Sequence, residues 1–161
     1  MIASAEVEYE GYCQWTRVQE IMEFARKINA HKIGIANCIG LINEARIFAQ
    51  ILRANNFEPY SVICKVAGQS KTSMGIPPQC ESIGASMCNP ILQARLLNEA
   101  HTDLNVVIGL CVGHDSLFYK YSEVYVTTLV TKDRVTGNNP PQLSIPPILT
   151  TRRNSSRILP S

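Results

Sequence analysis

Four of the six cysteines in this 161-residue sequence stand where a parallel sheet would bring them together. Cys38 and Cys111 each follow a short apolar run, and Cys64 lies toward the end of another such run. Cys88 precedes a predicted helix that leads back into the sheet. Ligands of open parallel sheets bind outside the carboxyl ends of the strands, where the loops converge. Because thiolates bind soft or borderline metals and attack electrophiles, this placement predicts a cysteine-lined site at that edge.

Cys88 and His114 are the strongest candidates for chemistry within this set. Cys88 stands just before Asn89-Pro90, a good N-cap followed by a residue that suits the first helical position. A thiol at a helix N-terminus feels the positive end of the helix dipole, which lowers its pKa and favours the thiolate. His114 follows Cys111 by three residues in a glycine-containing turn, so it could supply a nitrogen ligand or a general base. Asp115 could orient His114 or cap the short helix that follows.

A purely structural role for some of these cysteines stays open. Cys64 and Cys111 lie in apolar surroundings, and free cysteine is among the residue types most often buried. There is no C-x-x-C pair, so the sequence patterns of zinc ribbons and thioredoxins are absent. Four further residues receive no predicted role in the site: Cys13, Cys80, His31 and His101.

Alternating helical and strand patterns predict the elements that position these residues. Thr16 and Gln19 match a capping box at the start of the first periodic helix. A Gly-, Ser- and Pro-rich stretch over 68–85 predicts a long loop, and loops of that length are usually functional or mobile. The predicted helices are 16–29, 41–54, 90–100 and a short one ending near 121, and the predicted strands are 32–37, 60–66, 104–110 and 124–130. This order predicts an α/β fold: a three-layer (α-β-α), Rossmann-like domain with a mainly parallel sheet over 1–137, followed by an extended or disordered tail over 138–161.

The composition describes a single folded domain. Hydrophobic residues make up 45% of the chain and charged residues 17%, which excludes a disordered protein. The net charge of +2 is too small to indicate a nucleic-acid partner. No apolar run approaches the roughly 18 residues of a membrane span, and the glutamate-rich first ten residues do not resemble a secretory signal. We therefore expect a cytoplasmic protein whose thiols are free or bound to metal.

Two weaker patterns concern possible ligands. The segment 109–113 is not a G-x-G-x-x-G fingerprint, and no Walker motif is present, so a dinucleotide or nucleotide site has little support. Lys132-Asp133-Arg134 follows the last predicted strand and could orient an anionic ligand at the same edge.

Several segments resemble a prokaryotic family of uncharacterised proteins labelled metal-binding, a domain of unknown function with clustered cysteines. The resemblance extends from about residue 11 to 139, and it is carried by the segments 34–40, 62–66, 87–94, 97–100, 109–118, 127–130 and 132–135. The resemblance implies a metal site that uses cysteines and implies no particular reaction. The family's label rests partly on a further cysteine-rich N-terminal segment, where this chain has Cys13.

Three hypotheses of different classes follow. The leading one is a metal-binding protein that holds zinc or an iron-sulfur cluster, with the ligand set Cys38, Cys64, Cys88, Cys111 and His114. The second is a thiol enzyme in which Cys88 is the nucleophile, His114 the base and Asp115 its orienter, acting on a small substrate. The third is a non-catalytic binding or assembly module whose cysteines are packed. The expected partner is a small molecule or a metal, with no nucleic acid and no membrane, and a homodimer would cover the open sheet edges.

Overall fold

A four-stranded, all-parallel sheet forms the centre of the computed structural model, which describes residues 1–144. The strand order is β2-β1-β3-β4, and the strands are β1 (Lys32–Asn37), β2 (Glu58–Ile63), β3 (Leu104–Ile108) and β4 (Tyr125–Val130). The side chains of the central strands β1 and β3 are almost all buried, as expected for parallel strands covered on both faces.

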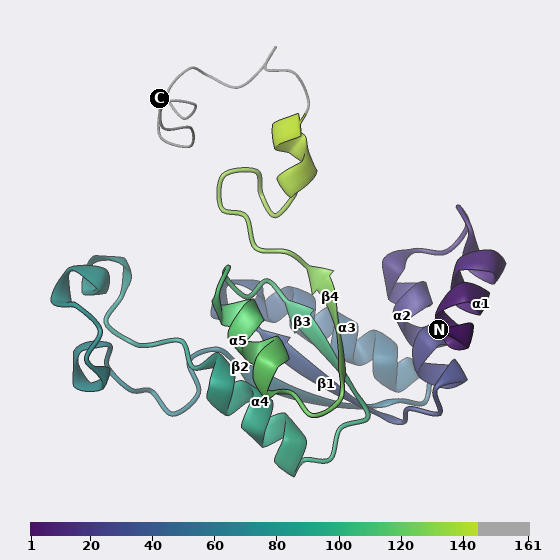
Figure 1. Ribbon diagram of the computed structural model, residues 1–161, viewed down its shortest axis with the longest axis horizontal. Coiled ribbons are helices and arrows are strands. Elements are labelled where there is room, and N and C mark those ends of the chain that lie inside the picture. Colours follow the sequence, from purple (N-terminus) through teal and green to yellow (C-terminus); the bar gives the residue numbers. More distant parts are fainter. Residues whose placement is uncertain (145–161) are drawn as a thin grey trace.

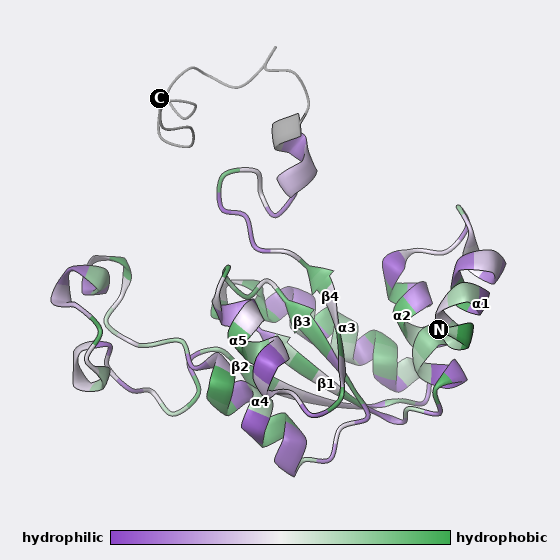
Figure 2. Ribbon diagram, viewed as in Figure 1, coloured by the Kyte–Doolittle hydropathy of each residue, from purple (hydrophilic) through white to green (hydrophobic). Residues whose placement is uncertain are grey.

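Helices cover both faces of this sheet (Figure 1). They are α1 (Ile2–Gly11), α2 (Arg17–Lys27), α3 (Ile42–Ala54), α4 (Pro90–Glu99) and α5 (His114–Tyr121). Ile33 and Ile35 of β1 pack in one apolar core with α2 and α3, whereas Ala36 packs in a second core with α4 and α5. Because neighbouring strand residues point to opposite faces, the two cores lie on the two sides of the sheet. The predicted three-layer α/β fold is therefore confirmed, and Figure 2 shows hydrophobic residues in the sheet and on parts of the helices that cover it.

Local signals in the sequence set several element boundaries. The Thr16 side chain caps α2, and the Gln19 side chain bonds back to the Thr16 backbone, so the predicted capping box is present. Asn89 caps α4 by accepting a hydrogen bond from the N–H of Leu92 at 2.9 Å. At α5 the N-cap is Gly113 rather than the predicted Asp115, because Asp115 already lies in the first helical turn.

Two strands differ by two or more residues from the predicted bounds, and one helix was not predicted. The strand predicted over 60–66 spans 58–63, because the chain turns after Cys64 and reaches a left-handed conformation at Ala67. The strand predicted over 104–110 stops at Ile108, because Gly109 has a φ of +66°. The helix α1 packs beside α2, where Lys27 forms ion pairs with two glutamates of α1.

The segment 68–89 projects from the body of the domain as a long loop (Figure 1). It contains two 3-10 turns, η2 (Thr72–Met74) and η3 (Pro78–Ile83), and an antiparallel bridge between Ser70 and Ser86 closes its base. Of the predicted C-terminal tail, the structure describes 138–144, which includes the 3-10 turn η4 (Pro140–Ser144). The remainder of the tail lies outside the described residues.

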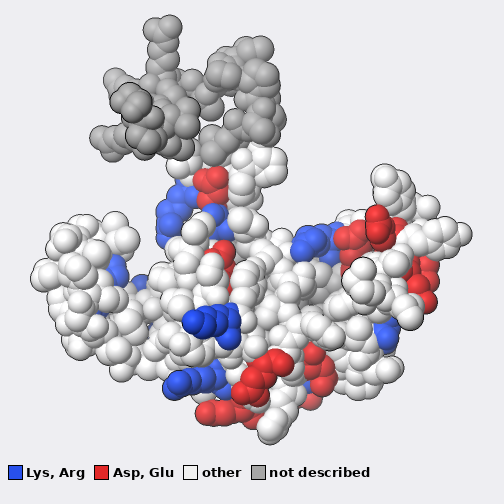
Figure 3. Space-filling view, in the orientation of Figure 1, with Lys and Arg blue, Asp and Glu red and all other residues white. Residues whose placement is uncertain are grey.

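Charge is distributed unevenly over the face drawn in Figure 3. Asp and Glu gather on and beside α1, whereas Lys and Arg occupy the segment that follows β4. Within residues 1–144, no helix is both long enough and apolar enough to cross a bilayer.

Candidate thiol site at the carboxyl edge of the sheet

Backbone hydrogen bonds hold three cysteine-bearing loops together at the carboxyl edge. Cys38 directly follows β1, and its N–H donates to the carbonyl of Ile108 at the end of β3 at 3.0 Å. Cys64 directly follows β2, and its N–H donates to the carbonyl of Asn37 at 2.8 Å. The N–H of Asn89 donates to the carbonyl of Cys64 at 2.8 Å, which fixes the residue after Cys88 beside Cys64. The predicted convergence of these loops is thus a consequence of sheet pairing and its extension past the strand ends.

The side chains of Cys38, Cys64 and Cys88 form what we call the thiol cluster. The sulfurs of Cys88 and Cys64 are 3.7 Å apart, and Cys38 is a further hydrogen-bonding neighbour of Cys64. The N–H of Ile39 also approaches the Cys64 sulfur, at 3.3 Å. Cys64 is only 2% exposed, whereas Cys38 and Cys88 are partly exposed. Cys64 is therefore the buried centre of the cluster, and the other two thiols lie at its accessible rim.

Hydrogen bonds between Cys64 and its two neighbouring sulfurs dominate the ionisation of the cluster. The hydrogen bond from Cys64 lowers the pKa of Cys38 to about 5, and the backbone of Gly40 and the charge of Lys132 contribute in the same direction. Hydrogen bonding to Cys38, then to Cys88, together with burial, raises the pKa of Cys64. The cluster thus favours a thiol at its centre and thiolates at its rim.

Cys88 has the most acidic environment of the three thiols. The hydrogen bond from Cys64 and the neighbouring His114 side chain lower the pKa of Cys88 to about 4, and Lys65 adds a positive charge nearby. Cys88 is a thiolate at neutral pH in this environment, the form that binds metal or attacks an electrophile.

Cys111 has a hydrogen-bond partner outside the thiol cluster. The Arg134 guanidinium donates a hydrogen bond to the Cys111 sulfur at 3.1 Å. Arg134 belongs to the Lys132-Asp133-Arg134 segment that the sequence places at this edge. No hydrogen bond joins Cys111 to another thiol among the described residues, so Cys111 is a neighbour of the cluster rather than part of it.

His114 and Asp115 are adjacent in sequence and have separate partners. His114 starts α5 and contacts Cys88. The Asp115 carboxylate accepts hydrogen bonds from the N–H groups of Gly113 and Ser116, at 3.0 and 2.7 Å. Within residues 1–144 the structure therefore does not bring Asp115 to His114, and Asp115 stabilises the turn into α5 instead.

A cavity of about 590 Å³, here called the thiol cavity, opens beside the cluster. It lies between the 68–89 loop and the starts of α4 and α5, and Cys88, Cys111 and His114 line it. Cys80, for which the sequence predicted no role, also lines it, whereas Cys13 is exposed between α1 and α2.

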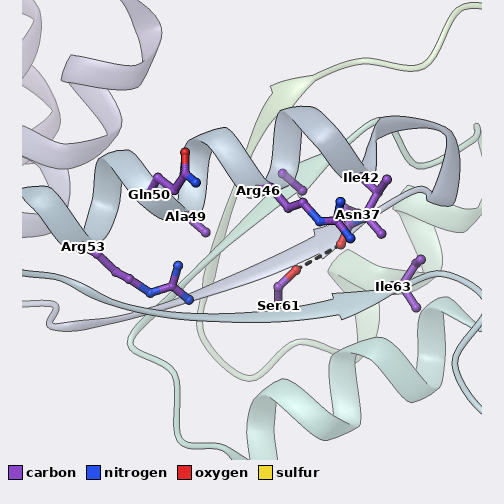
Figure 4. A pocket seen from close by; sticks show the side chains of 9 residues that line it. Asn37, Ile42, Arg46, Ala49, Gln50, Arg53, Ser61 and Ile63 are labelled. Carbon is purple, nitrogen blue, oxygen red and sulfur yellow. Dashed lines mark hydrogen bonds between the residues drawn. The ribbon is translucent and has the colours of Figure 1, made fainter.

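The Asn37 side chain supports the backbone of the thiol cluster through hydrogen bonds, a role that sequence reasoning missed. Its side chain is 2% exposed, accepts a hydrogen bond from Ser61 at 3.1 Å and donates one to the carbonyl of Cys38 at 3.1 Å. Figure 4 shows the Ser61 bond in a hollow of about 430 Å³ that Arg46 and Arg53 of α3 also line. A polar residue closing an otherwise apolar strand, as Asn37 does after 33–36, is the signal that could have marked it.

Among residues 1–144, no group of three or more His, Cys, Asp or Glu side chains is positioned to hold a metal ion as the side chains stand. The sulfurs of the thiol cluster are hydrogen-bonded to one another.

Fold and site together define a three-layer α/β protein with a thiol cluster at its carboxyl edge. Residues 1–129 match the family described as protein of unknown function, DUF1847, and the chain belongs to that family. It is 50% identical over 136 residues to the uncharacterised protein MJ0455 of Methanocaldococcus jannaschii, a match that covers 84% of this chain and 70% of that relative. The predicted membership of a prokaryotic family of uncharacterised proteins is thereby confirmed.

A partial match to a solved structure was also found. The crystal structure of Dph2 from Pyrococcus horikoshii aligns with 58% of this chain at 19% identity and a TM-score of 0.39. The match spans only 22% of that protein's chain.

Proposed function

We propose that the thiol cluster is a metal site, in which Cys38, Cys64 and Cys88 bind zinc or an iron-sulfur cluster. The observation that carries the proposal is the meeting of three cysteines from three different loops, with the sulfurs of Cys64 and Cys88 3.7 Å apart. Two thiolates bound at about 2.3 Å to a tetrahedral centre are separated by about 3.8 Å, so this spacing fits shared ligation.

Charge also supports the proposal. Lys65, Lys132 and Arg134 each act electrostatically on a sulfur of the cluster or on Cys111. Three thiolates bound to a divalent cation leave a net charge of about −1. The nearby lysine and arginine side chains offset this negative charge. Metal ligation requires deprotonated thiols, so binding releases the proton held on Cys64. Small rotations of the Cys38 and Cys88 side chains are needed, since no metal-binding group is preformed within residues 1–144.

Three protein ligands leave a coordination position for a small molecule, which is the arrangement of catalytic rather than structural metal sites. That position would face the thiol cavity, because Cys88 lines it. His114 and Cys111, which belong to the predicted ligand set, are proposed to lie beside the metal and to contact what binds there.

The second candidate is a thiol enzyme with Cys88 as its nucleophile. The specific observation in its favour is that Cys88 combines a pKa of about 4 with a place on the cavity wall beside His114. His114 would exchange a proton with the leaving group, and no orienting carboxylate is assigned because Asp115 is bonded elsewhere.

Metal content of anaerobically purified protein tests both proposals. We expect about one zinc ion or cluster per chain in the unmodified protein and in Cys13→Ser, whose exposed thiol provides the matched control. Cys38→Ser, Cys64→Ser and Cys88→Ser should each lose the metal, and a brown colour would identify an iron-sulfur cluster.

Metal-free protein in every folded sample would overturn the metal proposal. Alkylation by iodoacetamide at pH 6, mapped by mass spectrometry, then decides the second candidate. Preferential reaction at Cys88 supports the thiol enzyme, whereas reaction at Cys88 no faster than at the exposed Cys13 leaves the packed-cysteine hypothesis.

A further inference from the structure

The walls of the thiol cavity differ sharply in character. One part is apolar and flexible, since six long side chains supply it: Met74, Ile76, Ile83, Met87, Ile91 and Leu117. The other part carries three cations, Lys65, Lys71 and Arg134. The lining residues, all within the described part of the chain, include no Asp and no Glu. The cavity therefore offers positive charge and apolar surface to one ligand.

The cations are held at the cavity by bonds that leave most of their donors free. Lys65 donates to the carbonyl of Ser86, and Lys71 donates to the carbonyl of Cys80. A lysine ammonium has three N–H donors and a guanidinium has five, so each group keeps donors for an anion. Both lysine bonds end on the 68–89 loop, which means that the loop forms the cavity wall and fixes the lysines in place.

Ionised thiols do not neutralise this charge. Cys38 and Cys88 together supply at most two negative charges, and a metal bound to all three thiols leaves about one. The cavity lining itself carries three positive charges, from Lys65, Lys71 and Arg134, so a surplus remains in either case.

We infer that the thiol cavity binds an organic anion, a carboxylate or a phosphate ester that carries an apolar chain or ring. The head group pairs with Arg134 and Lys71, and the apolar part packs against the methionine- and isoleucine-rich wall. A volume of about 590 Å³ fits a small molecule rather than a macromolecular segment. This inference rests on the proposed function, because the anion is the class of substrate that the cavity would present to Cys88.

Calorimetric titration of metal-free protein with four probes tests the inference: hexanoate, hexyl phosphate, 1-hexanol and inorganic phosphate. We expect hexanoate or hexyl phosphate to bind at least about tenfold more tightly than 1-hexanol and inorganic phosphate. The tighter of the two identifies the head group. Arg134→Gln and Lys71→Gln should each weaken that binding by about tenfold, whereas the control Lys120→Gln on the exposed side of α5 should not.

Equal affinity for hexanoate and 1-hexanol, binding of no probe, or equal effects of Lys120→Gln and Arg134→Gln would each overturn the inference. Cys38→Ser separates it from the proposed function. That variant should lose metal and keep its affinity for the anion. Failure of the metal proposal therefore appears in the metal content, and failure of the anion inference appears in the binding titration.

Discussion

Replacement of Cys64 by alanine is expected to raise the pKa of Cys88, because the hydrogen bond between the Cys64 and Cys88 sulfurs is the largest influence that lowers it. With a pKa of about 4, Cys88 is fully ionised from pH 5 to 8, and its alkylation rate should be nearly constant over that range. In Cys64→Ala the remaining influences are His114, Lys65 and burial. A rise of the pKa to about 6 or more makes the rate fall about tenfold or more between pH 7 and pH 5.

The assay is iodoacetamide labelling of metal-free protein, with peptide mapping to separate Cys88 from Cys38. Cys64→Ser is the matched control, since its hydroxyl can still donate a hydrogen bond and should preserve the flat profile. Circular dichroism establishes that both variants are folded. A flat profile in Cys64→Ala would refute the reasoning, because it would show that His114 and Lys65 suffice to ionise Cys88.

Two further predictions concern stability and are checked by urea unfolding. Gly34→Ala should cost about 3 kcal/mol, because the new Cβ would lie 1.9 Å from Asn105 Oδ1 in a closed core, whereas Gly40→Ala, with its nearest contact at 3.9 Å, should cost less than about 1 kcal/mol. Asp103→Asn should cost about 1 kcal/mol at pH 7, since the carboxylate accepts backbone N–H bonds, foremost from Lys32, that lower its pKa. A lowered folded pKa adds stability above the unfolded value near pH 4, so this difference should vanish as the pH falls below about 3. Equal unfolding for the two glycine variants, or an Asp103→Asn deficit independent of pH, would contradict these accounts.

The fold was predictable because its signals are local and repeated. The apolar run 33–36 and the capping residues Thr16 and Asn89 specify their elements without reference to distant parts of the chain. Parallel strands then bring Cys38 and Cys64 to one edge by topology alone. The predicted end of β3 was wrong because a single residue interrupts the strand there: Gly109, directly after Ile108, has a positive φ.

The composition of the site was less predictable, because it depends on where irregular segments run. Nothing in the spacing of its residues shows that the 68–89 loop brings Lys71 and Cys80 to the cavity that Cys88 lines. Cys111 and Arg134 lie in separate loops, and their pairing follows from the path of the chain after β4. Side-chain distances of a few ångströms decide which cysteines share a proton, and sequence patterns specify only the edge at which they meet.

Both proposed chemistries depend on Cys64, and one substitution separates them. A serine at this position retains a hydrogen-bond donor but replaces a soft thiolate ligand with a hydroxyl. Cys64→Ser should therefore lose the metal while Cys88 stays ionised and alkylates at an unchanged rate. Retention of metal by this variant would remove Cys64 from the ligand set and point to Cys111 as the third thiol. Loss of both metal binding and the flat alkylation profile would mean instead that the buried thiol, rather than its hydrogen bond, maintains the geometry of the cluster.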